Sequence, residues 1–171
     1  MQTKQLGNIG EAKTLWKFVS LNIPVYIPFG DNEKADLIAE FGGKLNKIQI
    51  KTSENVKDGK FEVGLRSSTI HNGVNYYHTY SKEEIDYFAI YNLESDILML
   101  IPISELEKRT SIKISISRTP SRNQYKSFNW KEYTFEKVIL SAETLHEASL
   151  QKDEEKVQTT TGNSGHGVEI S

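Results

Sequence analysis

The chain of 171 residues contains no cysteine and has few features of secreted or membrane proteins. Without cysteine it can form no disulfide framework, no thiolate metal site and no thiol nucleophile. Its longest apolar stretch, residues 97–103, is about a third of the length that a helix needs to cross a bilayer. No apolar run follows the first charged residues, as it would in a secretory signal. We therefore expect a cytoplasmic protein that contacts no membrane.

The motifs of several common enzyme classes are also missing from the sequence. The histidines have no zinc-ligand spacing, and no H-E-x-x-H motif occurs. The G-x-S-x-G turn of serine hydrolases is absent, and the GNIG segment lacks the lysine and the length of a phosphate-binding P-loop. Zinc-dependent, serine-nucleophile and P-loop chemistry are therefore not expected.

Charge is unevenly distributed along a chain whose formal net charge is only −2. Residues 108–137 contain eight lysines and arginines but only two acids, Glu132 and Glu136. A basic segment of this kind suggests a polyanionic partner for one face of the protein. A solvated, lysine-rich surface would give the same composition, so charge alone leaves both interpretations open.

The length suits one domain, which we place at residues 1–145. Apolar spacing predicts an amphipathic helix over 8–21, including Ile9, Ala12, Trp16 and Val19, with Asn8 as its N-cap. Alternating patterns predict strands at 23–29, 35–40, 44–52, 61–64, 74–79, 85–91, 96–102 and 111–117.

The remaining segments carry weaker signals. A short helix can begin at Ser104, and residues 118–135 resemble an irregular binding arm more than a core element. The polar tail, residues 150–171, is expected to be disordered. Together these patterns predict an α/β (α+β) fold with a mixed central sheet flanked by helices.

The segment with most chemical information is residues 30–53, where Phe41-Gly42-Gly43 predicts a hairpin between two strands. Gln49 and Lys51 alternate with Ile48 and Ile50, so the two polar side chains share one face. The hairpin can bring Asp36 of the preceding strand close to them. A carboxylate, an amide oxygen and an ammonium would then meet, as metal-assisted phosphodiester hydrolysis requires. Each of these residues alone could equally be an ordinary polar residue of an exposed strand.

This arrangement resembles the PD-(D/E)XK nuclease superfamily, in which an aspartate precedes a (D/E)-X-K triplet on the next strand. The triplet here is Gln49-Ile50-Lys51, and Glu11 matches a glutamate that many members carry on their first helix. Residues 7–107 look most like the intron-encoded homing endonucleases of this class. The resemblance implies a restriction-endonuclease-like core and a site-specific, Mg²⁺- or Mn²⁺-dependent endonuclease acting on double-stranded DNA. It also implies metal binding by Asp36, Glu11, Gln49 and the backbone carbonyl of Ile50.

Gln49 departs from the family pattern because most members have Asp or Glu at this position. An amide oxygen can still ligate a metal ion, but it contributes no negative charge. The homing endonucleases tolerate glutamine here, which favours that subgroup. A junction-resolving or restriction-type nuclease on the same fold, and a DNA-binding protein with a decayed site, remain the alternatives.

Two polar segments, 54–82 and 108–137, are the expected DNA-binding loops. Their side chains suit contacts with phosphates and base edges, and the candidates are Lys57, Lys60, Arg66, His71, Tyr76, Lys113, Arg118, Arg122, Asn123, Gln124 and Lys126. Flexible surface loops are the alternative interpretation. One chain offers one metal site, so cutting both strands of a duplex leads us to expect a homo-oligomer, a dimer or tetramer.

Overall fold

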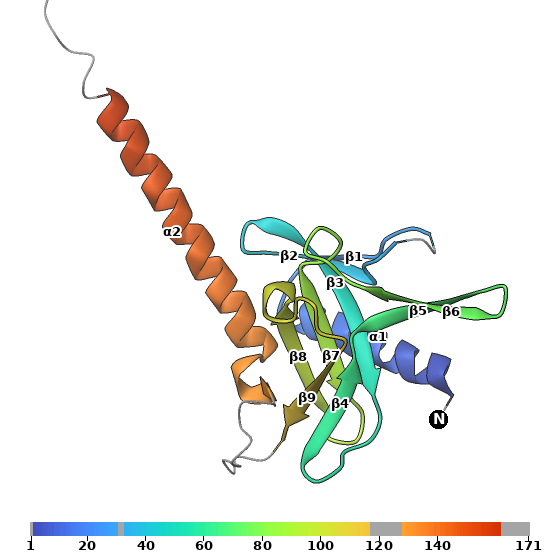
Figure 1. Cartoon of the computed structure of the whole chain (residues 1–171). Coiled ribbons are helices and arrows are strands. Elements are labelled where there is room, and N and C mark those ends of the chain that lie inside the picture. The colour runs from blue at the N-terminus through green and yellow to red at the C-terminus, as the bar shows by residue number, and fades with distance from the viewer. Residues whose placement is uncertain (1, 31–32, 117–127, 162–171) are drawn as a thin grey trace, which may run out of the picture.

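The computed structural model describes residues 2–30, 33–116 and 128–161. Its core is a five-stranded mixed sheet in the order β1-β2-β3-β7-β8, and the only parallel pair in it is β3–β7 (Figure 1). The strands of this sheet are β1 Val25–Tyr26, β2 Leu37–Phe41, β3 Lys44–Ser53, β7 Tyr87–Asn92 and β8 Ile97–Pro102. A mixed sheet with helices beside it confirms the predicted fold class.

The other strands form a second, three-stranded sheet and a separate hairpin. Strands β4, β5 and β6 lie between β3 and β7 in the chain, and β9 and β10 follow β8. The sheet has the order β10-β9-β4, and the hairpin consists of β5 and β6. The bounds are β4 Lys60–Gly64, β5 Arg66–His71, β6 Val74–Thr79, β9 Ser111–Ser115 and β10 Phe128–Asn129. Short 3₁₀ helices follow β8 and β10, η1 Ile103–Glu105 and η3 Trp130–Glu132.

Helix α1, Thr3–Ser20, begins earlier than predicted and packs by a different face. Its N-cap is Gln2, without a side-chain hydrogen bond, so the prediction of Asn8 as N-cap was wrong. The buried side is Gly10, Thr14 and Phe18, whereas Trp16 and Val19 are about 60% exposed (59% and 61%). The helix lies so close to the sheet that a Cβ at position 10 would overlap the hydroxyl of Thr52. Close approach selects small residues, which a search for apolar spacing overlooks.

The predicted hairpin between β2 and β3 is present, with Phe41 paired to Lys44 and Leu37 paired to Ile48. Gly42 and Gly43 form its turn with φ values of +59° and +70°, a left-handed conformation that glycine adopts without strain. The buried amide of Asn46 donates to the carbonyl of Phe41 at 2.9 Å and so holds the turn from inside.

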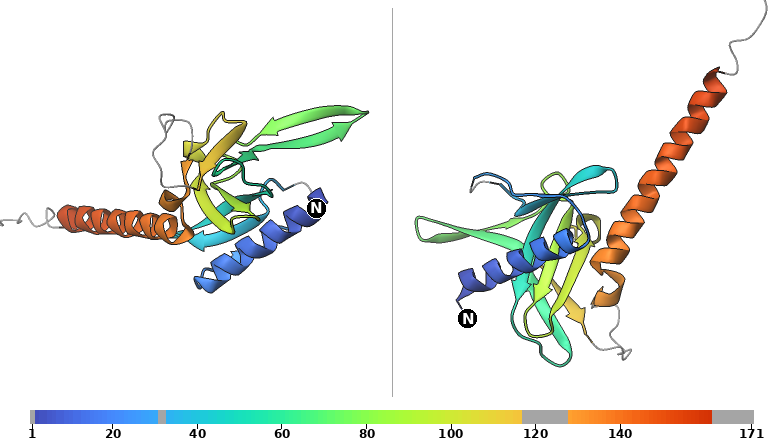
Figure 2. Two further views of the ribbon diagram at one scale, coloured as in Figure 1. Left: turned by 90° about the horizontal axis from the view of Figure 1, so that it is seen from below. Right: turned by 180° about the vertical axis from the view of Figure 1, so that it is seen from behind.

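Helix α2, Phe135–Thr161, was not predicted. Phe135 and Ile139 are buried, and Ala142 and His146 lie against the β2–β3 turn, while the helix beyond them extends away from the sheets (Figures 1 and 2). Residues 150–161 are therefore helical, in contrast to the expected lack of structure, and residues 162–171 lie outside the described residues. Phe135, expected in an irregular arm, belongs to the core because it completes the aromatic contact with Phe18 at 4.8 Å.

Two hydrophobic clusters cover the two faces of the central sheet. The helix-side cluster includes Phe18, Ile48, Ile50 and Phe135, and both helices contribute to it. The sheet-side cluster includes Phe61, Phe88 and Ile114 and joins the central sheet to β4 and β9. Strand β3 passes between the clusters, so both of its faces are covered over residues 48–50. Within the described residues, none of the helices has the length and apolar character needed to span a membrane.

Candidate active site

The site begins where the pairing of β2 with β3 ends. The backbone amide of Asp36 donates to the carbonyl of Ile48 at 2.9 Å, one residue before β2 starts. Beyond that point, the carboxylate of Asp36 takes the place of a strand partner, since its Oδ2 accepts the amide hydrogen of Ile50 at 2.7 Å. The end of a short strand thus fixes one carboxylate against the edge of β3.

Gln49 lies against the same carboxylate. Its side chain is only 7% exposed, and its Nε2 donates to Asp36 Oδ2 and, at 3.2 Å, to the backbone carbonyl of Ile50. The amide group therefore lies between two oxygen atoms that come from different elements. The structure brings Asp36, Gln49 and the Ile50 carbonyl together, as the hairpin prediction required.

Lys51 extends from the next position on the same face of β3. Its Nζ donates to the backbone carbonyl of Arg66 at 3.3 Å and to the hydroxyl of Tyr80 at 3.5 Å. The ammonium also lies 5.0 Å from the centre of the Tyr80 ring. Asp36 acts on this lysine through its charge, while the hydrogen bonds of the ammonium go to the first residue of β5 and to the residue that follows β6.

Burial shifts both ionisable groups toward their neutral forms. Desolvation raises the pKa of the Asp36 carboxyl, against the hydrogen bond from Ile50, and the charge of Glu11 raises it further. Desolvation likewise lowers the pKa of the Lys51 ammonium, and the negative charge of Asp36 opposes this shift. Glu11 is exposed on α1 and lies near enough to Asp36 for their charges to interact. A cation placed between the two carboxylates would relieve that repulsion.

The donor set fits a hard divalent cation. It comprises the carboxylate of Asp36, the carbonyl of Ile50, the amide oxygen of Gln49 after rotation of the amide, and the more distant carboxylate of Glu11. Within residues 2–30, 33–116 and 128–161, no group of three or more His, Cys, Asp or Glu side chains is placed to hold a metal ion. Any ion here would therefore depend on neutral oxygens and water in addition to carboxylates.

The expected DNA-binding residues fall in three places. Arg66, His71 and Tyr76 lie on the β5–β6 hairpin and are exposed. Lys57 and Lys60 lie at the start of β4, and Lys113 lies on β9, where it pairs with Glu62 at 3.6 Å. The others, Arg118, Arg122, Asn123, Gln124 and Lys126, lie outside the described residues.

Sequence reasoning missed the β5–β6 hairpin and the tyrosine at its base. Strand β5 was treated as part of a polar loop, although Asn72-Gly73 is a strong signal for a two-residue hairpin turn. Both turn residues have positive φ, +49° and +75°, as this turn type requires. Tyr80, adjacent to the predicted strand 74–79, had no pattern of its own to connect it with Lys51. That contact depends on the tertiary fold.

Comparisons with known proteins identify the family and the fold of this chain. The sequence model of the PD-(D/E)XK endonuclease family matches residues 1–136. Among solved structures, the bacterial homing endonuclease I-Ssp6803I superimposes with a TM-score of 0.66, covering 89% of this chain and 99% of that protein at 21% sequence identity. No curated protein sequence matches the chain. At this identity the solved structure demonstrates a shared fold, whereas the family model covers most of the sequence. The chain therefore belongs to the PD-(D/E)XK endonuclease family.

Proposed function

We propose that this nuclease is a site-specific, metal-dependent endonuclease that hydrolyses phosphodiester bonds in double-stranded DNA. The observation that supports this most directly is the junction of Asp36, Gln49 and the Ile50 carbonyl at the end of β2, with Lys51 on the same strand. Oxygen ligands and an ammonium that meet at one place on a sheet are the groups that phosphodiester hydrolysis needs.

Asp36, Gln49, Ile50 and Glu11 would hold the ion, Mg²⁺ or Mn²⁺. When bound, a divalent ion of this kind polarises the phosphate and lowers the pKa of coordinated water. Asp36 contributes its charge only when ionised, and the hydrogen bond from the Ile50 amide favours the ionised form. Glu11 supplies a second negative charge that the neutral Gln49 does not provide. In this proposal Glu11 offsets the departure from the family triplet.

Lys51 provides the positive charge that the reaction needs beside the metal. Its ammonium can hold the attacking water in line with the phosphate and offset the negative charge that develops in the transition state. The contacts with Arg66 and Tyr80 restrict a side chain that would otherwise sample many rotamers. Lys51 therefore completes the predicted catalytic set, which is Asp36, Gln49, Lys51 and Glu11.

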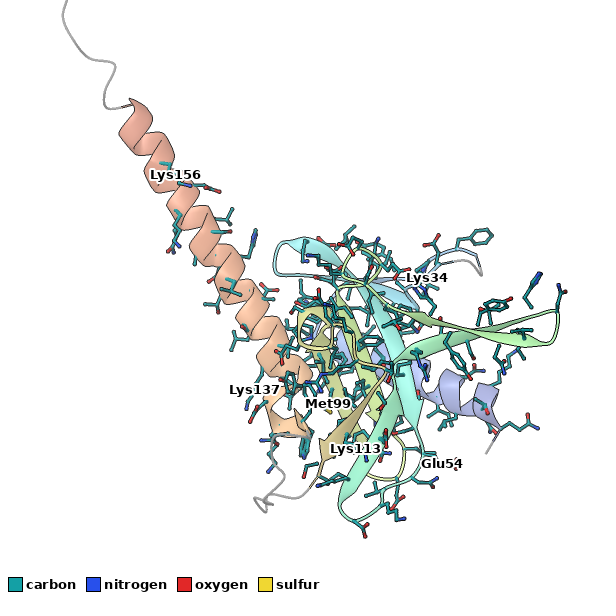
Figure 3. The ribbon with its side chains drawn as sticks, viewed as in Figure 1. Lys34, Glu54, Met99, Lys113, Lys137 and Lys156 are labelled. Carbon is teal, nitrogen blue, oxygen red and sulfur yellow. The ribbon has the colours of Figure 1, made fainter. Side chains whose placement is uncertain are left out.

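The β5–β6 hairpin offers a surface for DNA. It extends from the body of the protein, and its side chains stand out from the ribbon (Figures 1 and 3). No acidic residue occurs between Glu62 and Glu83, and the hairpin carries Ser, Thr, His, Asn and Tyr side chains that suit base edges. The major groove of B-DNA admits a two-stranded β-ribbon. We therefore place Arg66, His71 and Tyr76 in the DNA interface.

Rare-site cleavage is the behaviour that we propose, as in intron-encoded homing, because the fold is similar to that of a bacterial homing endonuclease. The glutamine-containing triplet resembles the same type of enzyme. The enzyme would act inside the cell, where its double-stranded DNA substrate is located. A single chain supplies one site, whereas cleavage of both strands of a duplex needs two, so we propose that two or more copies assemble as a dimer or tetramer. Analytical ultracentrifugation with and without a DNA duplex would determine the number of chains.

Incubation of the purified protein with plasmid and genomic DNA, first with Mg²⁺ and then with EDTA, tests the function. We expect metal-dependent cleavage at a rare site, and Asp36→Ala and Lys51→Ala should each lower the rate at least about a thousandfold while DNA affinity is kept. Matched controls are Glu40→Ala on β2 and Lys47→Ala on β3, both exposed, which should cleave normally.

Other outcomes would select another function. Structure-selective cleavage would indicate a junction-resolving nuclease, and frequent cleavage at a short sequence would indicate a restriction-type enzyme. Binding without cleavage under any metal condition would indicate a decayed site. Normal cleavage by either site variant would show that the site has been placed wrongly.

A further inference from the structure

The contacts around Lys51 extend to one residue that no motif singles out. Tyr80 directly follows β6 and is 7% exposed, and its hydroxyl lies 3.5 Å from Lys51 Nζ. The other acceptor for Lys51 is the carbonyl of Arg66, the first residue of β5. Arg66 and Thr79 are paired across the hairpin, so both acceptors lie at its base. The ammonium is thus held by the two ends of one hairpin.

Tyr80 is itself fixed by the body of the protein. Its ring meets Phe88 edge to face at 5.5 Å, and Ser67 hydrogen-bonds to its hydroxyl. The neighbouring His78 bonds to Glu84 at 2.8 Å, and Glu84 also accepts the backbone amide of Ser81 at 3.0 Å. These contacts attach the hairpin base to the segment between β6 and β7.

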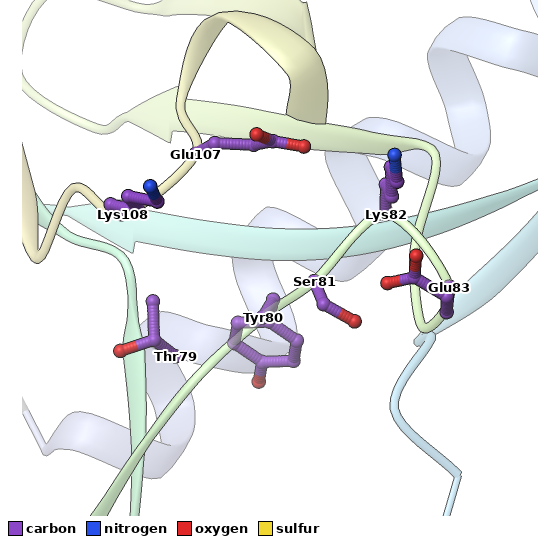
Figure 4. A pocket seen from close by; sticks show the side chains of 7 residues that line it. All are labelled: Thr79, Tyr80, Ser81, Lys82, Glu83, Glu107 and Lys108. Carbon is purple, nitrogen blue, oxygen red and sulfur yellow. The ribbon is translucent and has the colours of Figure 1, made fainter.

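The segment that follows β6 also lines a hollow at the surface. An open cavity of about 460 Å³ lies there, lined by residues 79–83 together with Glu107 and Lys108. Figure 4 shows the Tyr80 hydroxyl directed away from Glu107 and Lys82. Tyr80 belongs to the sheet-side hydrophobic cluster, and its phenol is held by its contacts with Ser67, Phe88 and Lys51.

We propose that Tyr80 is a positioning residue for Lys51, and that through it the placement of the lysine depends on the β5–β6 hairpin. This inference rests on the proposed function. A lysine side chain has four flexible bonds and loses substantial rotamer entropy when it is held in one geometry. The hydroxyl of Tyr80 and the carbonyl of Arg66 supply that geometry before DNA binds. When the hairpin binds in the DNA groove, it then fixes the position of Lys51 relative to the substrate.

The variant Tyr80→Phe tests the proposal because it keeps the ring and its contact with Phe88 and removes only the hydroxyl. We expect the single-turnover cleavage rate to fall about tenfold, which corresponds to the loss of one hydrogen bond to a charged group. The dissociation constant for the same DNA, measured with Ca²⁺ in place of Mg²⁺, should be unchanged. Tyr91→Phe is the matched control, since it removes the hydroxyl of another buried tyrosine, which bonds to Asp96 at 2.8 Å instead of to Lys51. That control should cleave at the parent rate.

The outcomes separate this inference from the proposed function. If the parent protein cleaves and Lys51→Ala does not, but Tyr80→Phe cleaves at the parent rate, only the role of Tyr80 is overturned. A loss of DNA affinity equal to the loss of rate would also overturn it, because Tyr80 would then be a DNA contact. If thermal unfolding shows that Tyr80→Phe does not fold, Ser67→Ala replaces it. That variant should lose about threefold in rate at constant affinity, and an unchanged rate would overturn the proposal.

Discussion

Two hairpins of this protein share a turn type and differ in almost everything else. Gly42-Gly43 and Asn72-Gly73 both connect antiparallel strands through two residues with positive φ. The β2–β3 hairpin lies inside the central sheet, with buried residues at alternate positions of β2 and with α2 against its turn. The β5–β6 hairpin forms a sheet of its own, and almost all of its residues are exposed.

The comparison shows how one local rule serves two purposes. Turn residues determine that a hairpin forms, and the side chains of its strands determine whether a core covers it. Burial makes the β2–β3 hairpin a fixed frame for Asp36 and Gln49. Exposure leaves the polar side chains of the β5–β6 hairpin available for a partner. Lys51 connects the two hairpins, since it lies on β3 and bonds to the base of the other hairpin.

Shortening the exposed hairpin should have the largest effect on DNA binding. We expect replacement of residues 68–77 by Asn-Gly to weaken binding to the mapped cleavage site at least about a hundredfold, since several base-edge contacts would be lost. The melting temperature should change little, because the removed side chains are exposed. Fluorescence anisotropy at one fixed salt concentration measures the affinity. Unchanged affinity would remove this hairpin from the DNA interface.

Replacing the second turn residue of each hairpin by alanine compares the buried turn with the exposed turn, because the two glycines have similar φ values. Gly73 has φ +75° and open space around it, so Gly73→Ala should cost about 1 kcal/mol from the left-handed conformation alone. Gly43 has φ +70°, and a Cβ there would overlap the ring of His146 on α2, so Gly43→Ala should cost about 2–3 kcal/mol.

Urea denaturation of both variants measures these differences. Adding His146→Ala should recover part of the loss in Gly43→Ala and none of the loss in Gly73→Ala. Equal costs at the two turns would mean that α2 does not restrict the β2–β3 hairpin.

The smallest effect is on the free energy of unfolding, which the buried charge of Asp36 lowers. Burial raises the pKa of Asp36 above its value in the unfolded chain, so the folded state binds the proton more tightly and ionisation of Asp36 opposes folding. Asp36→Asn keeps an oxygen that can accept from Ile50 and removes the charge. This variant should therefore stabilise the fold by about 1 kcal/mol or less at neutral pH while it abolishes cleavage.

The pH dependence of that difference provides the check. The gain of Asp36→Asn should be greatest above the pKa of Asp36 and should shrink as the pH falls and the parent carboxyl takes up its proton. Thermal unfolding of both proteins across this range, without divalent metal, gives the measurement. A variant that is less stable than the parent at neutral pH would indicate that the carboxylate contributes to folding through its hydrogen bonds.

Sequence alone determined the elements whose signals are local. The glycines at 42–43, the alternation of Gln49 and Lys51 with apolar residues, and the apolar strands β7 and β8 predicted the central sheet and the meeting of Asp36 with Gln49. The Asn72-Gly73 turn carried an equally local signal for the second hairpin, which the loop interpretation overlooked. These features follow from turn geometry and from the two-residue period of a strand.

Tertiary structure decided what depends on contacts between distant segments. The close approach of Gly10 to Thr52 determines which face of α1 packs on the sheet. Helix α2 packs where it does because it covers Phe18 and the β2–β3 turn. The contact of Tyr80 with Lys51 likewise joins residues 29 positions apart. Such contacts leave no periodic trace in a single sequence, because burial depends on which surfaces meet and not on the spacing within either segment.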